Sequence, residues 1–151
     1  MLFRRKNILD KISVGITTFE HRFDQYFVPL LSKIREYDND TEIIVAVNGE
    51  HDREFGEDYR KRILEFLCIQ RNVYPIFSRF RGLSKLWNTI ILRAICDHVF
   101  MLNDDIMIIK RNVIEKIQRN IQRGGGRSFV INKSWSHFVV SREELDRTGL
   151  F

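Results

Sequence analysis

Apolar and polar positions along the chain follow two alternating periods. Four short runs are apolar at most positions, which is typical of strands in a parallel sheet that is covered on both faces. Between the runs, apolar residues recur at intervals of three and four, which predicts helices with one apolar stripe. The predicted elements are, in chain order, a strand at 12–18, a helix at 27–34, a strand at 41–47, a helix around 63–67, a strand at 73–78, a helix at 83–95 and a strand at 98–102.

This order of elements predicts an α/β fold with a mostly parallel sheet and right-handed crossovers. Pro75 is unfavourable within the third strand, because proline lacks the amide hydrogen that a strand inside a sheet donates. Ligands of such sheets bind beyond the carboxyl ends of the strands. All four of those ends are polar, which predicts one cleft lined by Thr17–Glu20, Asn48–Glu50, Ser78–Gly82 and Asn103–Asp105.

The pattern changes after Asp105. Apolar spacing predicts a further helix over 113–121, and the three glycines at 124–126 predict a flexible turn. Two more strands are predicted at 128–132 and 137–140.

The last predicted helix begins with a capping motif. Ser141 and Glu144 match the N-cap and N3 positions of a capping box, which predicts a helix through about Arg147. The sequence then stops at Phe151, an apolar residue, without a closing element. We therefore expect it to be part of a longer protein.

Composition and charge narrow the class of protein only slightly. The chain has 151 residues, the length of one domain, and no apolar run approaches the roughly 20 residues that cross a bilayer. Its 25 Lys and Arg and 20 Asp and Glu give a net charge of +5, and most of these charges are interspersed. A mixed, solvated surface therefore outweighs a nucleic-acid-binding face, and no nucleic-acid partner is expected. The local exceptions are Arg79 with Arg81, and Arg4–Lys6, which leaves peripheral contact with a membrane open.

The two cysteines favour a cytoplasmic protein. Cys68 and Cys96 are too few for a disulfide framework and neither belongs to a CxxC pair, so a reducing compartment is expected. Both lie on the apolar sides of predicted helices, where we expect them to pack in the core.

The triplet Asn103-Asp104-Asp105 is the most informative candidate for chemistry. Two adjacent carboxylates at the end of a buried strand repel each other, so their placement requires compensation. A divalent cation that also binds a substrate diphosphate supplies it. A solvated turn explains the same three residues equally well, since Asn and Asp are common in turns.

Five segments, in this order, resemble the family 2 nucleotide-sugar glycosyltransferases, which have the GT-A fold. They are VGITTFEHR, EIIVAVNG, GLSKLWNTII, HVFMLNDDIMI and SHFVVSREELDRTGLF. The resemblance implies a GT-A-like three-layer α/β/α architecture with a Rossmann-like nucleotide-binding half. It implies a basic N-terminal segment at 1–11, a donor-binding region at 12–110 and the incomplete start of an acceptor-side region at 111–151.

The resemblance also implies which residues bind the nucleotide sugar. Asp105 is the expected ligand of Mn²⁺ or Mg²⁺, with the amide of Asn103 as a weaker one. Val47 stands where the family commonly has an Asp that contacts the base. The implied nucleotide-sugar contacts are Thr17, Thr18, Glu20, Asn48, Arg79, Arg81, Gly82, Asn88, Asn103 and Asp104.

The activity implied is metal-dependent transfer of a sugar from a nucleoside diphosphate to an acceptor hydroxyl, with inversion. The metal would neutralise the leaving diphosphate, and Arg79 or Arg81 would assist. The family's general base lies on a motif beyond Phe151, so the catalytic residue is unassigned. A glycan is the expected acceptor. Trp135 is a candidate for stacking on a sugar and His21 for contacting phosphate, although packing and a solvated loop explain them as well.

Two alternatives from other classes remain open at the level of sequence. One is a non-catalytic nucleotide-binding or nucleic-acid-binding α/β module that uses the same cleft. The other is a metal-dependent nucleotidyltransferase, because a pair of Asp residues at a sheet end also serves that chemistry. The chain lacks the glycine-rich, basic phosphate loop after the first strand that would favour the second alternative.

Overall fold

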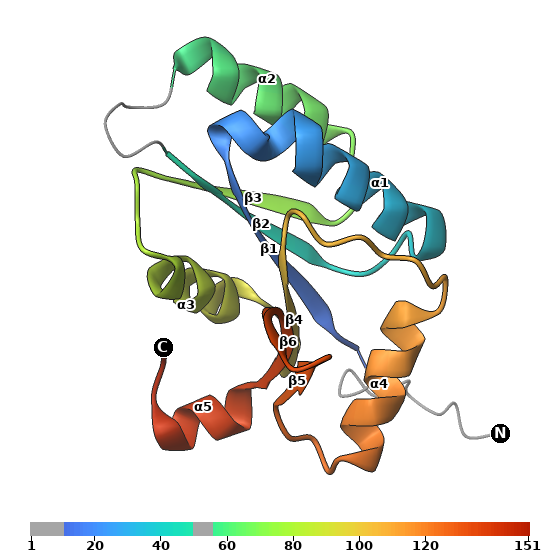
Figure 1. The fold of residues 1–151 in the computed structure, drawn as a ribbon. Helices are drawn as coiled ribbons and strands as arrows, with labels where there is room; N and C mark the ends of the chain where they lie inside the picture. The colour runs from blue at the N-terminus through green and yellow to red at the C-terminus, as the bar shows by residue number, and fades with distance from the viewer. Residues whose placement is uncertain (1–10, 50–55) are drawn as a thin grey trace, which may run out of the picture.

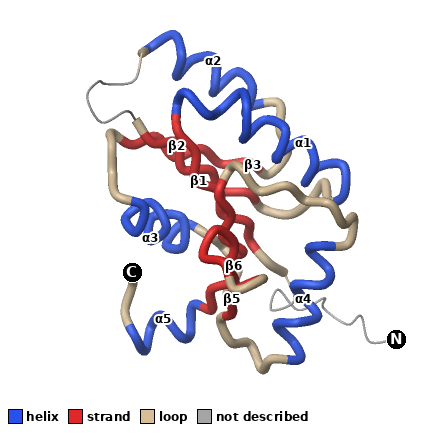
Figure 2. Tube along the Cα trace, viewed as in Figure 1, coloured by secondary structure: helices blue, strands red, loops and turns tan. Residues whose placement is uncertain are grey.

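A six-stranded sheet with the order β3-β2-β1-β4-β6-β5 is the centre of the molecule (Figures 1 and 2). The computed structural model describes residues 11–49 and 56–151. Strands β1 to β4 are parallel, whereas β6 is antiparallel to β4 and β5 is antiparallel to β6. The strands are β1 (Ser13–Phe19), β2 (Ile43–Asn48), β3 (Val73–Ser78), β4 (His98–Asn103), β5 (Phe129–Ile131) and β6 (Ser134–Ser141).

Helices cover both faces of the sheet, which confirms the predicted three-layer α/β/α fold. Helices α1, α2 and α4 pack on one face, and α3 and α5 pack on the other (Figure 1). A 3-10 turn η2 (Glu20–Arg22) and a π-helical turn η3 (Phe23–Phe27) connect β1 to α1. The helices are α1 (Val28–Tyr37), α2 (Glu57–Cys68), α3 (Leu83–Arg93), α4 (Val113–Arg123) and α5 (Arg142–Thr148).

The residues of individual strands suit the positions that those strands occupy in the sheet. All six residues of β2 are buried, as expected of a central strand with helices on both faces. Pro75 is accommodated because β3 is the edge strand of the sheet and pairs only with β2. Asn132 and Lys133 both have positive φ, 52° and 57°, and join β5 to β6 by a two-residue turn.

Gly15 of β1 allows helix α3 to approach the sheet closely. A Cβ atom at this position would lie 2.5 Å from Cγ2 of Ile90 and 2.8 Å from Sδ of Met101. Both of those side chains are buried. Any larger residue would therefore require the side chains of Ile90 and Met101, or the elements that carry them, to shift.

Two details of the sequence prediction are wrong. The helix predicted over 83–95 ends at Arg93, and Ile95 is exposed because the chain has already left the helix. Cys68 is exposed at the last position of α2 instead of lying in the core, while Cys96 is buried after the end of α3. Periodicity alone overestimates how far the apolar stripe of α3 continues.

The predicted capping box is also wrong in its bonding, although α5 begins where expected. Ser141 occupies the N-cap position with an extended backbone, but its side chain makes no capping hydrogen bond. Glu144 instead accepts a hydrogen bond of 2.6 Å from the backbone N–H of Ser128. Hydrogen bonds from the side chain and the backbone of Ser128 lower the pKa of Glu144 below its ordinary value. The carboxylate that could have closed the box thus holds the turn before β5.

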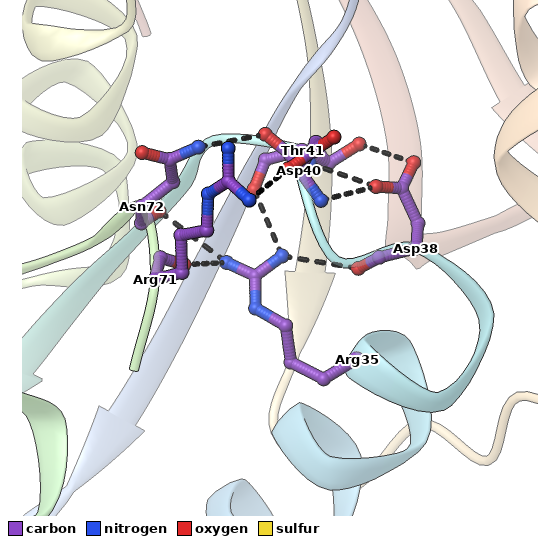
Figure 3. Close-up of polar contacts among 6 residues, drawn as sticks. All are labelled: Arg35, Asp38, Asp40, Thr41, Arg71 and Asn72. Atoms are coloured by element: carbon purple, nitrogen blue, oxygen red, sulfur yellow. Dashed lines mark hydrogen bonds and ion pairs between the residues drawn. The ribbon is translucent and has the colours of Figure 1, made fainter. Parts of the chain in front are cut away.

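Arg35 binds three segments together at the amino ends of β2 and β3 (Figure 3). Its Nη1 donates to the carbonyl oxygens of Asp38 and Thr41, and its Nη2 donates to those of Arg71 and Asn72. The end of α1, the start of β2 and the turn before β3 are therefore joined by one guanidinium. Desolvation lowers the pKa of Arg35 below its ordinary value.

Asp38 completes this cluster from the other side (Figure 3). Its carboxylate accepts hydrogen bonds from the backbone N–H groups of Asp40 and Thr41 and from the Thr41 hydroxyl, at 2.6–2.9 Å.

No helix among residues 11–49 and 56–151 is long and apolar enough to cross a membrane.

Candidate functional site

The carboxyl ends of the four parallel strands lie along one edge of the sheet, as the sequence predicts. Thr17 of β1 is in register with Asn103 of β4, and Phe19 is in register with Asn48 of β2. Asn48 in turn pairs with Ser78 of β3. Because β1 and β4 are neighbours, the loop after β1 and the Asp pair after β4 come together at this edge.

Asp104 is the centre of a buried polar cluster at this edge. Its carboxylate is only 4% exposed. The Thr18 hydroxyl donates a hydrogen bond of 2.7 Å to Oδ2. Arg22 donates from Nη2 to Oδ1 at 2.7 Å and from Nε to both oxygens at 3.1 Å. The carboxylate is thus fully occupied by a hydroxyl and a guanidinium from the segment that follows β1.

Arg22 lies between the two carboxylates. Its Nη2 is also 3.2 Å from Oδ2 of Asp105, and its guanidinium carbon lies 4.4 Å from the ring centre of Tyr26. Hydrogen bonding to Asp104, together with the charges of Asp104 and Asp105, raises the pKa of Arg22 above its ordinary value. The compensation that two adjacent carboxylates require therefore comes, in this structure, from a side chain of the protein.

The sequence analysis did not single out Arg22. A signal was available, because Arg22 is the one Lys or Arg between Thr17 and Phe27, in a loop that had to lie beside β4 if β1 and β4 were neighbours. Sequence alone does not give that strand order, so the pairing of Arg22 with Asp104 could not be predicted.

Asp105 differs from Asp104 in its environment. Its side chain is 50% exposed, and its recorded contact is the ion pair with Arg22. Asn103, the last residue of β4, is partly buried, and its carbonyl oxygen accepts the N–H of Ile106 in the turn that carries both carboxylates. Among the residues that the structure describes, Asp105 is the carboxylate of this edge that a ligand from solvent can reach. Glu50, which the sequence also places in the cleft, lies outside those residues.

Asn48 has a structural role that the sequence did not reveal. Its side chain is fully buried, its Nδ2 donates to the Arg81 carbonyl at 2.9 Å, and its Oδ1 accepts the Arg81 N–H at 2.9 Å. Asn48 therefore fixes the loop between β3 and α3. Val47 beside it is fully buried in the apolar core.

The loop that Asn48 holds presents two cations. Arg79 and Arg81 are exposed, and Gly82 occupies the N-cap position of α3. A Cβ atom at Gly82 would meet nothing within 4 Å. The exposed N-terminus of an eleven-residue helix, flanked by two arginines, is favourable for an anion at this edge.

Glu20 and Asn88, two other predicted contacts of the nucleotide sugar, lie in different parts of the fold. Glu20 is nearly buried at the start of η2, and its carbonyl oxygen accepts a hydrogen bond from the Tyr59 hydroxyl of α2. Asn88 lies in the second turn of α3, where its amide binds both the N–H and the carbonyl oxygen of Phe151. Asn88 thus holds the last described residue and is separated from the Asp104 cluster.

Phe151 belongs to an aromatic cluster on the α3 side of the sheet. Its ring centre is 5.5 Å from that of Trp87 and 5.9 Å from that of Phe138. Trp135 packs edge-on against Phe138 at 5.5 Å. The rings of Trp135, Phe138 and Phe151, together with α5, border a cavity of about 470 Å³. His21 is exposed, with its ring 5.9 Å from that of Phe19.

The donor set at the end of β4 fits a metal that shares its coordination with a substrate. Asp104 is not available, because Thr18 and Arg22 occupy both of its oxygens. Asp105 and the amide of Asn103 remain, and one or two such ligands suffice for Mg²⁺ or Mn²⁺ when phosphates supply the others. Among residues 11–49 and 56–151, no group of three or more His, Cys, Asp and Glu side chains could hold a metal by itself.

Comparison with solved structures establishes the fold. No protein-family model and no curated protein sequence matches the chain. The structure of TarS residues 1–349 from S. aureus in complex with UDP-GlcNAc matches with a TM-score of 0.67 and 15% identity, over 91% of this chain and 47% of the chain in that structure. The mannosyltransferase PcManGT from Pyrobaculum calidifontis, in complex with GDP-Man and Mn²⁺, matches with a TM-score of 0.62 and 14% identity, over 93% and 47%.

A nucleotidyl-transferring enzyme shares the same architecture. A CMP:2-keto-3-deoxy-manno-octonic acid synthetase in complex with CTP matches with a TM-score of 0.60 and 10% identity, over 91% of this chain and 77% of the synthetase. The chain has a GT-A-like fold and spans about half the length of the glycosyltransferase structures that it matches.

Proposed function

We propose that this chain binds a nucleoside-diphosphate sugar at the carboxyl edge of its sheet and serves as the donor-binding part of a glycosyltransferase. The observation that carries the proposal is the half-exposed carboxylate of Asp105, held beside Arg22 at the end of β4. The fold is that of proteins solved with UDP-GlcNAc and with GDP-Man. The reaction proposed is transfer of the sugar to an acceptor hydroxyl with inversion.

The residues of this edge divide the binding of the donor between them. Thr17 and Glu20, at the end of β1, are proposed to hold the base and ribose. Arg79, Arg81 and the N-terminus of α3 at Gly82 are proposed to bind the diphosphate, because they supply exposed positive charge. Asn48 acts indirectly in this proposal, since its amide fixes the backbone of Arg81.

Asn88 is proposed to act at a distance from the donor. It would influence the donor site through its hydrogen bonds to Phe151, which order the chain over α3.

Arg22 has two effects on the acidic pair. It neutralises buried Asp104, which keeps the turn 103–106 in place, and it orients Asp105 toward solvent. A divalent cation held by Asp105 and Asn103 would neutralise the charge that develops on the leaving diphosphate. Thr18 supports this arrangement through its hydrogen bond to Asp104.

Equilibrium titration with UDP, GDP and CDP, with and without Mn²⁺, tests the proposal. One nucleotide should bind in a metal-dependent manner, and Asp105→Ala should weaken that binding at least about tenfold, because the protein's carboxylate ligand is lost. Asp97→Ala is the matched control, since Asp97 is an exposed acid that precedes the same strand at the opposite edge. Binding that is independent of metal and equal in both variants would refute the proposal.

A second candidate function is nucleotidyl transfer. It is favoured by the likeness to a synthetase that was solved with CTP, because the match covers 77% of the synthetase chain. In that case a nucleoside triphosphate should bind more tightly than any nucleoside diphosphate. Release of pyrophosphate from the triphosphate, in the presence of a sugar acid or sugar phosphate, would identify this activity. A preference for an intact nucleoside-diphosphate sugar over the triphosphate would exclude it.

A further inference from the structure

The positive charge of this chain is concentrated in one stretch. Residues 106–133 contain seven Lys or Arg and a single acid, Glu115, which gives a net charge of +6. The whole chain carries +5, so the remaining residues sum to −1. In the sequence most charges are interspersed, and the predicted site of membrane contact is Arg4–Lys6, which lies outside the described residues. The structure shows where the larger excess is displayed.

Helix α4 displays this charge on one face. Ile114, Ile117 and Ile121 are buried against the sheet at a spacing of three and four. Lys116, Arg119 and Arg123 repeat that spacing two residues later, which places them on the opposite side of the helix. All three are exposed, and we refer to them as the α4 basic face. Glu115, 3.4 Å from Arg119, offsets only part of its charge.

The basic face continues beyond both ends of the helix. Lys110 and Arg111 directly precede α4, and Arg127 follows it, and all three side chains are exposed. Figure 1 shows α4 at the outer side of the molecule, next to the long connection from β4. Six exposed cations thus occupy a single helix and the residues that flank it.

Two exposed apolar side chains directly precede these cations along the chain. Met107 is 82% exposed and Ile109 is 79% exposed, whereas Ile108 between them is buried. Side chains in this segment alternate between inside and outside, so that Ile108 packs in the core while Met107 and Ile109 point toward solvent. Large aliphatic side chains directly before a Lys-Arg pair are unfavourable in water but suited to an interface between headgroups and acyl chains.

We propose that the α4 basic face, Lys110, Arg111, Met107 and Ile109 form a surface that binds an anionic phospholipid bilayer. The cations would contact lipid phosphates and carboxylates, and the two aliphatic side chains would insert below the headgroups. A nucleic acid would satisfy the cations but not the aliphatic side chains. Residues 106–128 contain no aromatic side chain on which a base could stack.

This surface is distinct from the proposed donor site but lies near it along the chain. Met107 follows Asp105 by two residues, so binding of the bilayer here brings the carboxyl edge of the sheet close to lipid headgroups. The inference does not depend on the proposed donor, because no residue of the α4 basic face is among the proposed nucleotide contacts.

Vesicle co-sedimentation tests the proposal. The protein should bind vesicles of phosphatidylcholine with about 30% phosphatidylserine, and should not bind pure phosphatidylcholine. The triple variant Lys116→Gln, Arg119→Gln, Arg123→Gln should bind the anionic vesicles about 100-fold more weakly, at about fivefold for each charge removed. The double variant Met107→Ser, Ile109→Ser should bind about tenfold more weakly.

A charge-matched control separates this surface from the net charge of the chain. The variant Lys61→Gln, Arg93→Gln, Arg147→Gln removes three exposed cations from α2, α3 and α5. It should lose less than about threefold in vesicle binding, because these residues lie outside the surface. Nucleotide titration of the α4 triple variant should match that of the unmodified protein, which keeps this test independent of the proposed function.

Three results would overturn the proposal. The first is equal binding, or no binding, to anionic and neutral vesicles. The second is an equal loss in the α4 triple variant and in the charge-matched control. The third is displacement of the vesicles by an RNA or DNA oligonucleotide whose own binding is unchanged in the Met107→Ser, Ile109→Ser variant, which would assign the surface to nucleic acid.

Discussion

The guanidinium of Arg22 binds both oxygens of Asp104, at 2.7 and 3.1 Å, and thereby joins the segment after β1 to the end of β4. These two strands are neighbours in the sheet, so the ion pair closes the carboxyl edge between them. It leaves Asp105 as the exposed carboxylate. The candidate site therefore depends on an arginine that balances one acid and presents the other.

Removal of Arg22 should destabilise the fold. Arg22→Gln leaves the carboxylate of Asp104 buried without its cation, and such a loss typically costs about 3–5 kcal/mol in a fully buried pair. Because Arg22 is 28% exposed, water replaces part of the interaction, and we expect a loss of about 1–3 kcal/mol in the free energy of unfolding by urea. In an Asp104→Asn background the same change should cost less than about 1 kcal/mol. Equal costs in both backgrounds would show that the pair is not coupled.

Arg22 should also determine how the protein binds metal without nucleotide. In the native arrangement Asp104 is occupied, so Mn²⁺ alone has only Asp105 and Asn103 and should bind weakly. In the Arg22→Gln variant both carboxylates become available to a cation. The affinity for Mn²⁺ should therefore rise about tenfold or more. Titration followed by the decrease in the electron paramagnetic resonance signal of free Mn²⁺ measures this affinity. An unchanged or weaker affinity would mean that Arg22 does not compete with a cation here.

Gly15→Ala should destabilise the sheet without altering the site. The new Cβ would overlap Cγ2 of Ile90 at 2.5 Å, and Ile90 is a stiff, fully buried side chain. Overpacking of this kind costs about 1–3 kcal/mol in unfolding free energy. Gly82→Ala, whose Cβ has no neighbour within 4 Å, should cost less than about 1 kcal/mol. The cost of Gly15→Ala should shrink in an Ile90→Ala background, and its persistence there would assign the effect to another contact.

Asp38 should make the stability of the fold depend on pH in the acid range. Partial burial acts to raise its pKa, but hydrogen bonds from Thr41 and from the Asp40 N–H, with the charge of Arg35, lower the pKa below its ordinary value. Its contribution is therefore present above the unfolded pKa, about 3.9, and is lost as the pH falls through the lower folded pKa. Asp38→Asn should destabilise the protein by roughly 1 kcal/mol at pH 7 and by less near pH 3. Equal losses at the two pH values would contradict this role.

The sequence was sufficient to predict the elements that carry strong hydrophobic patterns. The four parallel strands and the helices between them were predicted because β2 and β4 are nearly continuous apolar runs and α1 and α3 have clear stripes. Their polar carboxyl ends lie along one edge of the sheet, as the sequence predicts. The antiparallel addition of β6 beside β4 was not predicted, because the apolar patterns of β5 and β6 do not specify their partners.

The contacts within that edge could not be predicted, because they depend on strand order and on side-chain direction. Asn48 was expected at a ligand and is instead buried against the backbone of Arg81. Arg22 was not considered, although it neutralises Asp104. Glu144 was predicted to complete a capping box, but its carboxylate instead accepts a hydrogen bond from the backbone N–H of Ser128. In each case a polar side chain finds a partner from a segment distant in sequence, and periodicity contains no information about such pairs.

Amide chemical-shift mapping with the tightest-binding nucleotide and diamagnetic Mg²⁺ tests the central claim most directly, namely that the ligand binds at the carboxyl edge of the sheet. The account predicts that the largest shift changes occur at 17–22, 78–82 and 103–106. The opposite edge, at 38–42 and 71–72 in the Arg35 cluster, should change little. Shift changes that are largest at the Arg35 cluster or along α4, with those at 103–106 unaffected, would contradict the account.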